Sequence, residues 1–250
     1  MKKLALIGKD ISHSLSPALF NAAGLLKDGS GYDLIDSAIL SKAMEFIKTG
    51  MYDGANITAP FKEEILAYCN EFDPSVKATG ASNLIVKSGD SFKAFNTDTF
   101  GAYGPFEARG TKPSRVLIAG AGGASKAAAY IFSQKGFEIS IVNRNWEKAK
   151  EVAQKFNSGT IELFDLQDKI TQFDIFIYTI PVPITQLEQI DFQNIIIAEA
   201  NYKKPVLDKI KCKEYINGLE WLVHQAIPGF KLLTGKEPDT KAMFEMVQNG

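Results

Sequence analysis

The sequence predicts an α/β protein with two domains, and three observations lead to this fold class. Short apolar runs of strand length alternate with amphipathic helical stretches along the whole chain, which is the pattern of parallel sheets covered by helices. The chain has 250 residues, 45% of them hydrophobic, enough for one large core or two cores of ordinary size. A stretch rich in Gly, Pro and charge, residues 99–114, interrupts the pattern near the middle and favours two domains.

The N-terminal half begins with an apolar run, Leu4 to Ile7, that stops at Gly8. This run is too short for the hydrophobic segment of a signal peptide and is expected to be the first strand. Ser16 is expected to cap the next helix, which starts with Pro17 in its first turn and continues to about residue 26. Further elements expected here are strands at 32–35 and 53–57, a helix at 41–47 and a helix that begins at Pro60.

The C-terminal half reads as a βαβα unit followed by more strands. Strands at 115–119 and 138–142 alternate with helices at 123–134 and 146–156, and the apolar runs 174–178 and 195–198 are expected to be buried parallel strands. The stretch from about Leu219 onward is mainly helical. We therefore expect one domain over residues 1–100, completed by a C-terminal helix at about 222–250, and a second over 101–221.

Composition restricts the classes of function. The 28 basic and 29 acidic side chains nearly cancel, so charge alone would not recruit nucleic acid or an anionic membrane. Cys69 and Cys212 fit neither a metal-ligand spacing nor a disulfide framework, and no metal site is expected. Without an apolar run of the ~18 residues that a membrane span requires, the sequence favours a cytoplasmic protein that binds small molecules.

A glycine-rich turn follows the apolar strand at 115–119. Gly120, Gly122 and Gly123 stand where glycine lets the backbone approach a pyrophosphate and where the free N–H groups of a helix start face it. Ser125 occupies the third glycine position of the strict dinucleotide motif, so spacing alone also allows an ordinary tight turn. The surrounding βαβ pattern favours the cofactor.

The end of the next strand indicates which cofactor. An NAD enzyme usually has Asp or Glu there, but this chain has Asn143 followed by Arg144. A guanidinium matches a 2′-phosphate, so NADP is predicted. The alternative is a solvated surface arginine. Lys148, one turn into the next helix, would add positive charge or be simply exposed.

Several motifs, in the same order along the chain, resemble those of the shikimate dehydrogenase family: LIGKDISHSLSPALFN, ANITAPFKEEI, TGASNLI, FNTDTFG, IAGAGGASKAA, VNRNWEKA and NGLEWLVHQAIPGFKLLTG. The resemblance covers almost the full length. It implies an N-terminal α/β substrate domain, a Rossmann-type doubly wound NADP-binding domain, and a cleft between them where catalysis takes place.

The resemblance also implies roles for individual residues. Lys62 of NITAPFK and Asp98 of FNTD correspond to the family's catalytic pair. Ser14 and Ser16 would bind the substrate carboxylate, unless Ser16 only caps the helix. The remaining substrate-binding candidates are Asn56, Thr58, Asn83, Tyr202 and Gln225, and the cofactor-binding candidates are Gly120, Ala121, Gly122, Gly123, Ala124, Asn143, Arg144 and Asn145.

The sequence departs from the family mainly around the nicotinamide. After the strand DIFIY, the segment from Tyr178 to Pro183 lacks the usual Gly-Met. His13 and His224 lie inside motifs but have no Asp or Ser partner in sequence, so neither is assigned to catalysis. Other departures that affect packing are Leu84, Thr99, Trp221 and Leu233, and the shortened segment YKKPVL makes Tyr202 the weakest correspondence.

Three functions are therefore weighed. The first is NADP-dependent reduction of 3-dehydroshikimate to shikimate in aromatic amino-acid biosynthesis, which accounts for most motifs at once. The second is a quinate/shikimate dehydrogenase with relaxed cofactor use, against which Arg144 without a nearby acid argues. The third is a catalytically silent NADP-binding sensor, against which the retained Lys62 and Asp98 argue. A homodimer is one expected assembly, although the sequence does not fix the oligomeric state.

Overall fold

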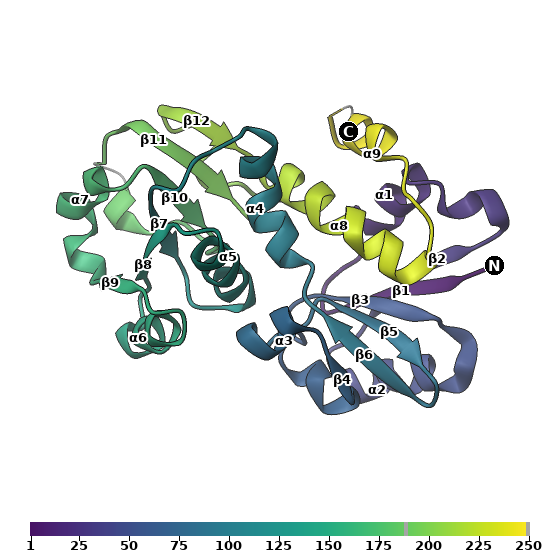
Figure 1. Cartoon of the computed structure of the whole chain (residues 1–250). Helices are drawn as coiled ribbons and strands as arrows, with labels where there is room; N and C mark the ends of the chain where they lie inside the picture. Colours follow the sequence, from purple (N-terminus) through teal and green to yellow (C-terminus); the bar gives the residue numbers. More distant parts are fainter. Residues whose placement is uncertain (188–189, 249–250) are drawn as a thin grey trace. The chain divides into compact units, whose positions relative to one another are not determined.

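The computed structural model describes residues 1–187 and 190–248, and the chain divides into two compact units. The first unit comprises Met1–Thr97 together with Val223–Gly250, and the second comprises Asp98–Leu222. The chain passes from one unit to the other after Thr97 and again inside helix α8 (Gly218–Thr234). Each unit has its own six-stranded sheet with helices packed on it (Figure 1). The predicted two-domain α/β fold class is confirmed.

The first unit contains a mixed sheet with the strand order β2-β1-β3-β5-β6-β4. Strand β1 pairs in parallel with β2 and β3, as the sequence predicts, whereas β5 is antiparallel to both β3 and β6. The β5–β6 hairpin, which turns at Gly89 with φ +60°, was not expected from the sequence. The strands are β1 Lys3–Gly8, β2 Gly31–Asp36, β3 Gly54–Ile57, β4 Glu71–Phe72, β5 Leu84–Ser88 and β6 Ser91–Phe95.

The first helix corrects two expectations. Helix α1 spans Ser16–Ala22 and so begins one residue earlier than predicted, with Leu15 at the N-cap position. Ser16 is the first residue of the helix and Leu15 at the N-cap position makes no side-chain cap, so the expectation that Ser16 caps the helix is wrong. The helix also ends well before residue 26, because Gly24 adopts φ +103°. The other helices of this unit are α2 Leu40–Phe46, α3 Pro74–Thr79, α9 Thr240–Gln248 and the short turns η1 Leu25–Asp28, η2 Ile47–Met51 and η3 Glu64–Tyr68.

The helix expected to begin at Pro60 is a set of turns followed by η3. An α-helix here would need the carbonyl of Lys62 to accept the N–H of Leu66. That carbonyl instead accepts the N–H of Ser82 at 2.7 Å, while the N–H of Leu66 bonds to Glu63 at 3.3 Å. A distant partner therefore takes the hydrogen bond that would have continued the helix.

The second unit contains a fully parallel sheet with the order β12-β11-β10-β7-β8-β9. Numbered within this unit, the order is 3-2-1-4-5-6, the arrangement of a dinucleotide-binding Rossmann fold. The strands are β7 Arg115–Ala119, β8 Glu138–Val142, β9 Gly159–Ile161, β10 Ile175–Tyr178, β11 Phe192–Glu199 and β12 Cys212–Ile216. Strands β7 and β8 have the predicted bounds, whereas the edge strands β9 and β12 were not expected.

Residues of β7 alternate between two cores, one on each face of this sheet. Val116 and Ile118 pack with the core that contains Phe106 of α4 and Phe132 of α5, whereas Leu117 joins the opposite core. A strand buried on both faces explains the continuous apolar run seen in the sequence. The helices are α4 Asp98–Ala108, α5 Gly123–Gln134, α6 Trp146–Lys155, α7 Leu166–Lys169 and the 3₁₀ turns η4 Leu163–Asp165, η5 Ile170–Gln172 and η6 Thr185–Leu187.

Throughout 1–187 and 190–248, no helix has both the length and the apolar character needed to cross a membrane.

Candidate active site

Lys62 lies in the turn that follows β3, and its backbone is fixed from two sides. The side chain of the preceding residue, Phe61, is only 2% exposed and packs in the core of the first unit. The Lys62 carbonyl bonds to Ser82, which is fully buried and whose hydroxyl donates to the carbonyls of Leu84 and Phe95, both at 2.9 Å. The half-buried Lys62 thus projects from a turn tied to the β5–β6 hairpin.

Three predicted substrate-binding residues of the first unit converge in one hydrogen-bonded network. The Asn83 amide donates to Gln225 Oε1 at 2.8 Å and to Thr97 Oγ1 at 2.9 Å, and Asn83 Oδ1 accepts the Thr97 N–H at 2.7 Å. Asn56 donates to the Asn83 carbonyl at 3.4 Å. Gln225 comes from α8, 142 residues along the chain, so only the fold brings these amides together.

Ser82 and Asn83 are neighbours, which relates this network to Lys62. Because Lys62 is bonded through its carbonyl to Ser82, the lysine backbone and the Asn83 amide are held by the same short segment. Thr58, at the end of β3, donates its N–H to the Ile7 carbonyl at 2.9 Å, and its carbonyl accepts the N–H of Phe61 at 3.0 Å. Thr58, Lys62 and the amide network are therefore tied together by hydrogen bonds near the C-terminal end of β3.

Ser14 and Ser16 also lie close together. The Ser14 hydroxyl donates to Ser16 Oγ at 3.2 Å, and Ser14 Oγ accepts the Ser16 N–H at 3.2 Å. Next to Ser16 is Tyr32, a residue that the sequence interpretation did not single out, whose hydroxyl donates to Asn56 Oδ1 at 2.8 Å. Tyr32 therefore joins the two serines to the amide network.

The predicted catalytic pair comes from both units. Asp98 is the first residue of α4 and is 5% exposed. It belongs to the second unit and Lys62 to the first, so their pairing stays a prediction. Tyr202 likewise belongs to the second unit, between β11 and β12, and its role at the substrate also stays a prediction.

The glycine turn has the geometry that requires glycine at its first position. Gly120 has φ +118°, and a Cβ there would lie 2.3 Å from Thr179 Oγ1 and 2.6 Å from Ser125 Oγ. Ser125, which replaces the third glycine of the strict motif, is fully buried and hydrogen-bonds to Thr179 at 2.6 Å. This bond links the first turn of α5 to the end of β10, and the Thr179 hydroxyl also donates to the Ala119 carbonyl of β7 at 2.8 Å. Strands β7 and β10 are the neighbours at which the strand order reverses.

The residues around this turn fit a dinucleotide. A Cβ on Gly122 would meet no described atom within 4 Å, so the space in front of it is open. Gly122 is the N-cap of α5, and none of the described side chains caps this helix, which leaves N–H groups of its first turn available to a phosphate.

The turn after β8 carries the predicted selector of the cofactor. Asn143 donates to the Asn145 carbonyl at 2.9 Å, and the Asn145 side chain accepts the N–H of Lys148 and so caps α6. Arg144 is exposed and makes no hydrogen bond or ion pair with any residue in the described ranges. Its guanidinium is therefore available to an anionic ligand.

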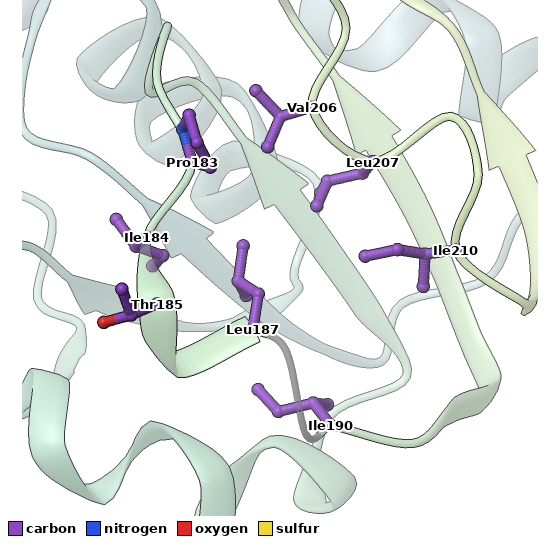
Figure 2. A pocket seen from close by; sticks show the side chains of 8 residues that line it. All are labelled: Pro183, Ile184, Thr185, Leu187, Ile190, Val206, Leu207 and Ile210. Carbon is purple, nitrogen blue, oxygen red and sulfur yellow. The ribbon is translucent and has the colours of Figure 1, made fainter.

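The segment that departs from the family has its own anchor. The Tyr178 hydroxyl donates to the Val182 carbonyl at 2.6 Å, and burial, with nearby Glu199, raises the Tyr178 pKa to about 12. Beyond it, Ile184 and Leu187 face Leu207 and Ile210 across an apolar pocket of about 480 Å³ (Figure 2). Among the described lining residues, only Thr185 carries a polar side chain, and its hydroxyl donates to Gln186 Oε1 at 3.3 Å.

Glu199 is a second residue that the sequence interpretation missed. Its buried carboxylate accepts the N–H groups of Val206 and Leu207 at 2.7 and 3.0 Å and the hydroxyl of Tyr215 at 2.8 Å. These bonds hold the segment that carries Tyr202 against β12. The shortened segment YKKPVL is thus anchored at its C-terminal end.

That neither histidine takes part in catalysis stays a prediction. The His224 ring packs edge-on against Phe244, with ring centroids 5.4 Å apart, and His13 is exposed.

Two family models match this chain, together covering most of it. Residues 6–85 match the shikimate dehydrogenase substrate binding domain, and residues 106–214 match shikimate / quinate 5-dehydrogenase. This chain belongs to the shikimate dehydrogenase family, as its motifs predict.

Known relatives are similar to this chain over nearly its whole length. A shikimate dehydrogenase (NADP⁺) of Caldicellulosiruptor saccharolyticus is 34% identical over 93% of this chain and 92% of its own. A solved shikimate dehydrogenase in complex with NADP⁺ has a TM-score of 0.85 at 29% identity, covering 100% of this chain and 95% of that one. The Thermus thermophilus enzyme in complex with shikimate has a TM-score of 0.86 at 26% identity, covering 100% and 98%.

Proposed function

We propose that this chain is an NADP-dependent shikimate dehydrogenase that catalyses the reversible reduction of 3-dehydroshikimate to shikimate in aromatic amino-acid biosynthesis. One observation carries the proposal beyond family membership. Asn56 and Gln225 both bond to Asn83, whose neighbour Ser82 donates its N–H to the Lys62 carbonyl. In this proposal the first unit holds the substrate and the second holds NADP.

In the proposed reaction, bound NADPH supplies a hydride to the ketone carbon. Lys62 donates the proton that the ketone oxygen acquires, so the carbonyl becomes a secondary alcohol. The Asp98 carboxylate holds the Lys62 ammonium and the reacting oxygen in position, a contribution to orientation. In the reverse direction the same pair removes the hydroxyl proton.

The other proposed roles follow from donor chemistry. Ser14 and Ser16 donate hydroxyl protons to the substrate carboxylate, while Asn56, Thr58, Asn83 and Gln225 bind its ring hydroxyls. Tyr202 approaches the carboxylate from the second unit. The turn at Gly120, Ala121, Gly122, Gly123 and Ala124 holds the pyrophosphate, and Asn143, Arg144 and Asn145 hold the 2′-phosphate, which favours NADP over NAD.

The experiment is a crossed assay on the purified chain. Shikimate or quinate is combined with NADP⁺ or NAD⁺, and the absorbance of the reduced nicotinamide is followed. We expect strong turnover with shikimate and NADP⁺ and little with the other three combinations.

Each other outcome favours another function. Equal turnover of quinate, or use of NAD⁺, would favour a quinate/shikimate dehydrogenase with relaxed cofactor use. Binding of NADP⁺, detected by calorimetry, without turnover of either substrate would favour the silent sensor.

We further propose that the protein works in the cytoplasm and assembles as a homodimer. The free thiols of Cys69 and Cys212 suit a reducing compartment. Light scattering on the purified chain tests the dimer, since a monomer mass across the accessible concentration range would contradict it.

A further inference from the structure

Tyr32 is held by its ring beside the proposed substrate network. It lies on β2, and its ring packs against Phe20 of α1 with centroids 4.7 Å apart. Phe20 packs in turn against Phe230 of α8, with centroids 5.7 Å apart. Phe20 thus packs directly on the Tyr32 ring and is itself supported by α8, and the Tyr32 hydroxyl is the group that forms hydrogen bonds.

The strand register explains how the hydroxyl reaches Asn56. Strand β1 lies between β2 and β3, with Leu4 opposite Tyr32 and Leu6 opposite Asn56. Since Leu4 and Leu6 are two residues apart, Tyr32 and Asn56 project from the same face of the sheet. The tyrosine side chain spans β1 on that face, and its hydroxyl lies 2.8 Å from Asn56 Oδ1.

This bond decides the orientation of the Asn56 amide. An amide has one acceptor oxygen and one donor nitrogen, and the two ends can exchange places by rotation about the last bond of the side chain. Because Tyr32 donates to Oδ1, Nδ2 points to the other side, where it reaches the Asn83 carbonyl at 3.4 Å. One N–H of Nδ2 makes that contact, which leaves the second N–H of the amide as a donor for a ligand.

The Tyr32 hydroxyl is kept as a donor. Burial raises the Tyr32 pKa above its ordinary value, and the Ser16 hydroxyl, which interacts with the tyrosine oxygen, only partly offsets this effect. The phenol therefore stays protonated throughout the neutral pH range.

We infer that Tyr32 is a positioning residue for substrate: its hydroxyl fixes the Asn56 amide with Nδ2 presented to a ring hydroxyl of shikimate. This inference rests on the proposed function, in which Asn56 binds that hydroxyl. Tyr32 touches the substrate only through Asn56 and takes no part in proton or hydride transfer.

The test is Tyr32→Phe, which keeps the ring and removes the hydroxyl. A net hydrogen bond of about 0.5–1.5 kcal/mol predicts that KM for shikimate rises about two- to tenfold. We expect kcat to change less than KM, and KM for NADP⁺ to stay unchanged. The matched control is Tyr52→Phe, since the Tyr52 hydroxyl also donates to a side chain of this sheet, Asp33 Oδ2 at 2.9 Å, outside the network.

A double-variant cycle separates positioning from general stability. In an Asn56→Ala background, Tyr32→Phe should cause no further rise in KM, because the amide through which it acts is gone. If Asn56→Ala does not fold, Asn56→Asp serves instead, since its carboxylate still accepts from Tyr32 but cannot donate to substrate. Thermal unfolding of every variant shows whether stability changes in parallel.

The outcomes distinguish the two proposals. If wild-type protein turns over shikimate but Tyr32→Phe leaves KM unchanged, or raises it as much as Tyr52→Phe does, the positioning role is wrong. Equal effects of Tyr32→Phe with and without Asn56 would also overturn it. If wild-type protein fails to turn over shikimate at all, the proposed function is at fault.

Discussion

The proposed substrate network of the first unit and the proposed 2′-phosphate site after β8 in the second unit differ in how their polar groups are held. Asn56, Asn83 and Thr97 are at most 5% exposed, and their polar atoms are bonded to one another. Arg144 is exposed and makes no bond within the described residues. The fold fixes the directions of the donors in the first region, whereas the second region presents an exposed charge.

This difference has energetic consequences. A buried, mutually bonded set should respond cooperatively, because removal of one member leaves its neighbours with unmade hydrogen bonds. An exposed guanidinium acts mainly through its charge and should be sensitive to salt. The effects of substitutions in the two regions should therefore differ in size, in additivity and in their dependence on salt.

The largest effect on activity is expected at Lys62, whose carbonyl is bonded to Ser82, the neighbour of Asn83 in the network. Loss of a general acid and base typically costs about 10²–10⁴-fold, so Lys62→Ala should lower kcat by roughly 10²-fold or more. Steady-state kinetics with shikimate and NADP⁺ measure this. Lys77→Ala, at an exposed lysine of α3 in the same unit, is the control and should leave kcat unchanged. An unchanged kcat in Lys62→Ala would end the catalytic assignment.

The glycine turn offers a second comparison, within the cofactor side itself. Gly120→Ala combines φ +118° with a Cβ 2.3 Å from Thr179 Oγ1 and should destabilise the protein by about 1–3 kcal/mol, measured by thermal unfolding. Gly122→Ala, where φ is −88° and the space is open, should leave stability unchanged but raise KM for NADP⁺, since its methyl group fills the approach to the pyrophosphate. Equal stability of both variants would contradict the geometry of the turn.

At Arg144 the predicted effect is confined to one cofactor. A charge-assisted hydrogen bond to a phosphate contributes about 1.5–3 kcal/mol, so Arg144→Ala should raise KM for NADP⁺ roughly tenfold or more. KM for NAD⁺, which lacks the 2′-phosphate, should not change. Added salt should reduce the difference in KM for NADP⁺ between wild type and variant. Lys155→Ala, at an exposed lysine near the end of α6, is the control. An equal loss with both cofactors would mean that Arg144 does not read the phosphate.

The sequence predicts best those strands whose own residues form a short, mostly apolar run. Strand β7 is apolar on both faces, so a short continuous run marks it, and in β8 Ser140 is the one polar residue from Ile139 to Val142. In the β5–β6 hairpin, β5 does not alternate and ends in the exposed Lys87 and Ser88, and the alternation of β6 covers only its five residues. The edge strand β12 is similar, with Lys213 and Glu214 at its centre.

The site shows the same limit more sharply. Motifs carry Lys62 and the amide residues, but the contacts that orient them join positions far apart in the chain. Tyr32 reaches Asn56 across 24 residues, and Glu199 reaches Tyr215 across 16. The helix expected at Pro60 failed for this reason, because the hydrogen bond from Ser82 to Lys62 is not encoded by the local sequence around either residue.

The segment after β10 is held partly by a local hydrogen bond, from the buried Tyr178 side chain to the Val182 carbonyl four residues on. Tyr178→Phe should lower stability by about 1 kcal/mol at neutral pH. An unfolded tyrosine ionises near 10, whereas burial raises the Tyr178 pKa to about 12 in the folded protein, so the stability contributed by this phenol is lost as pH rises from about 10 to 12. Denaturant unfolding of wild type and variant from neutral pH upward should therefore give a stability difference that shrinks above pH 10. A difference that stays constant over this range would show that the phenol is not protected from ionisation by the fold.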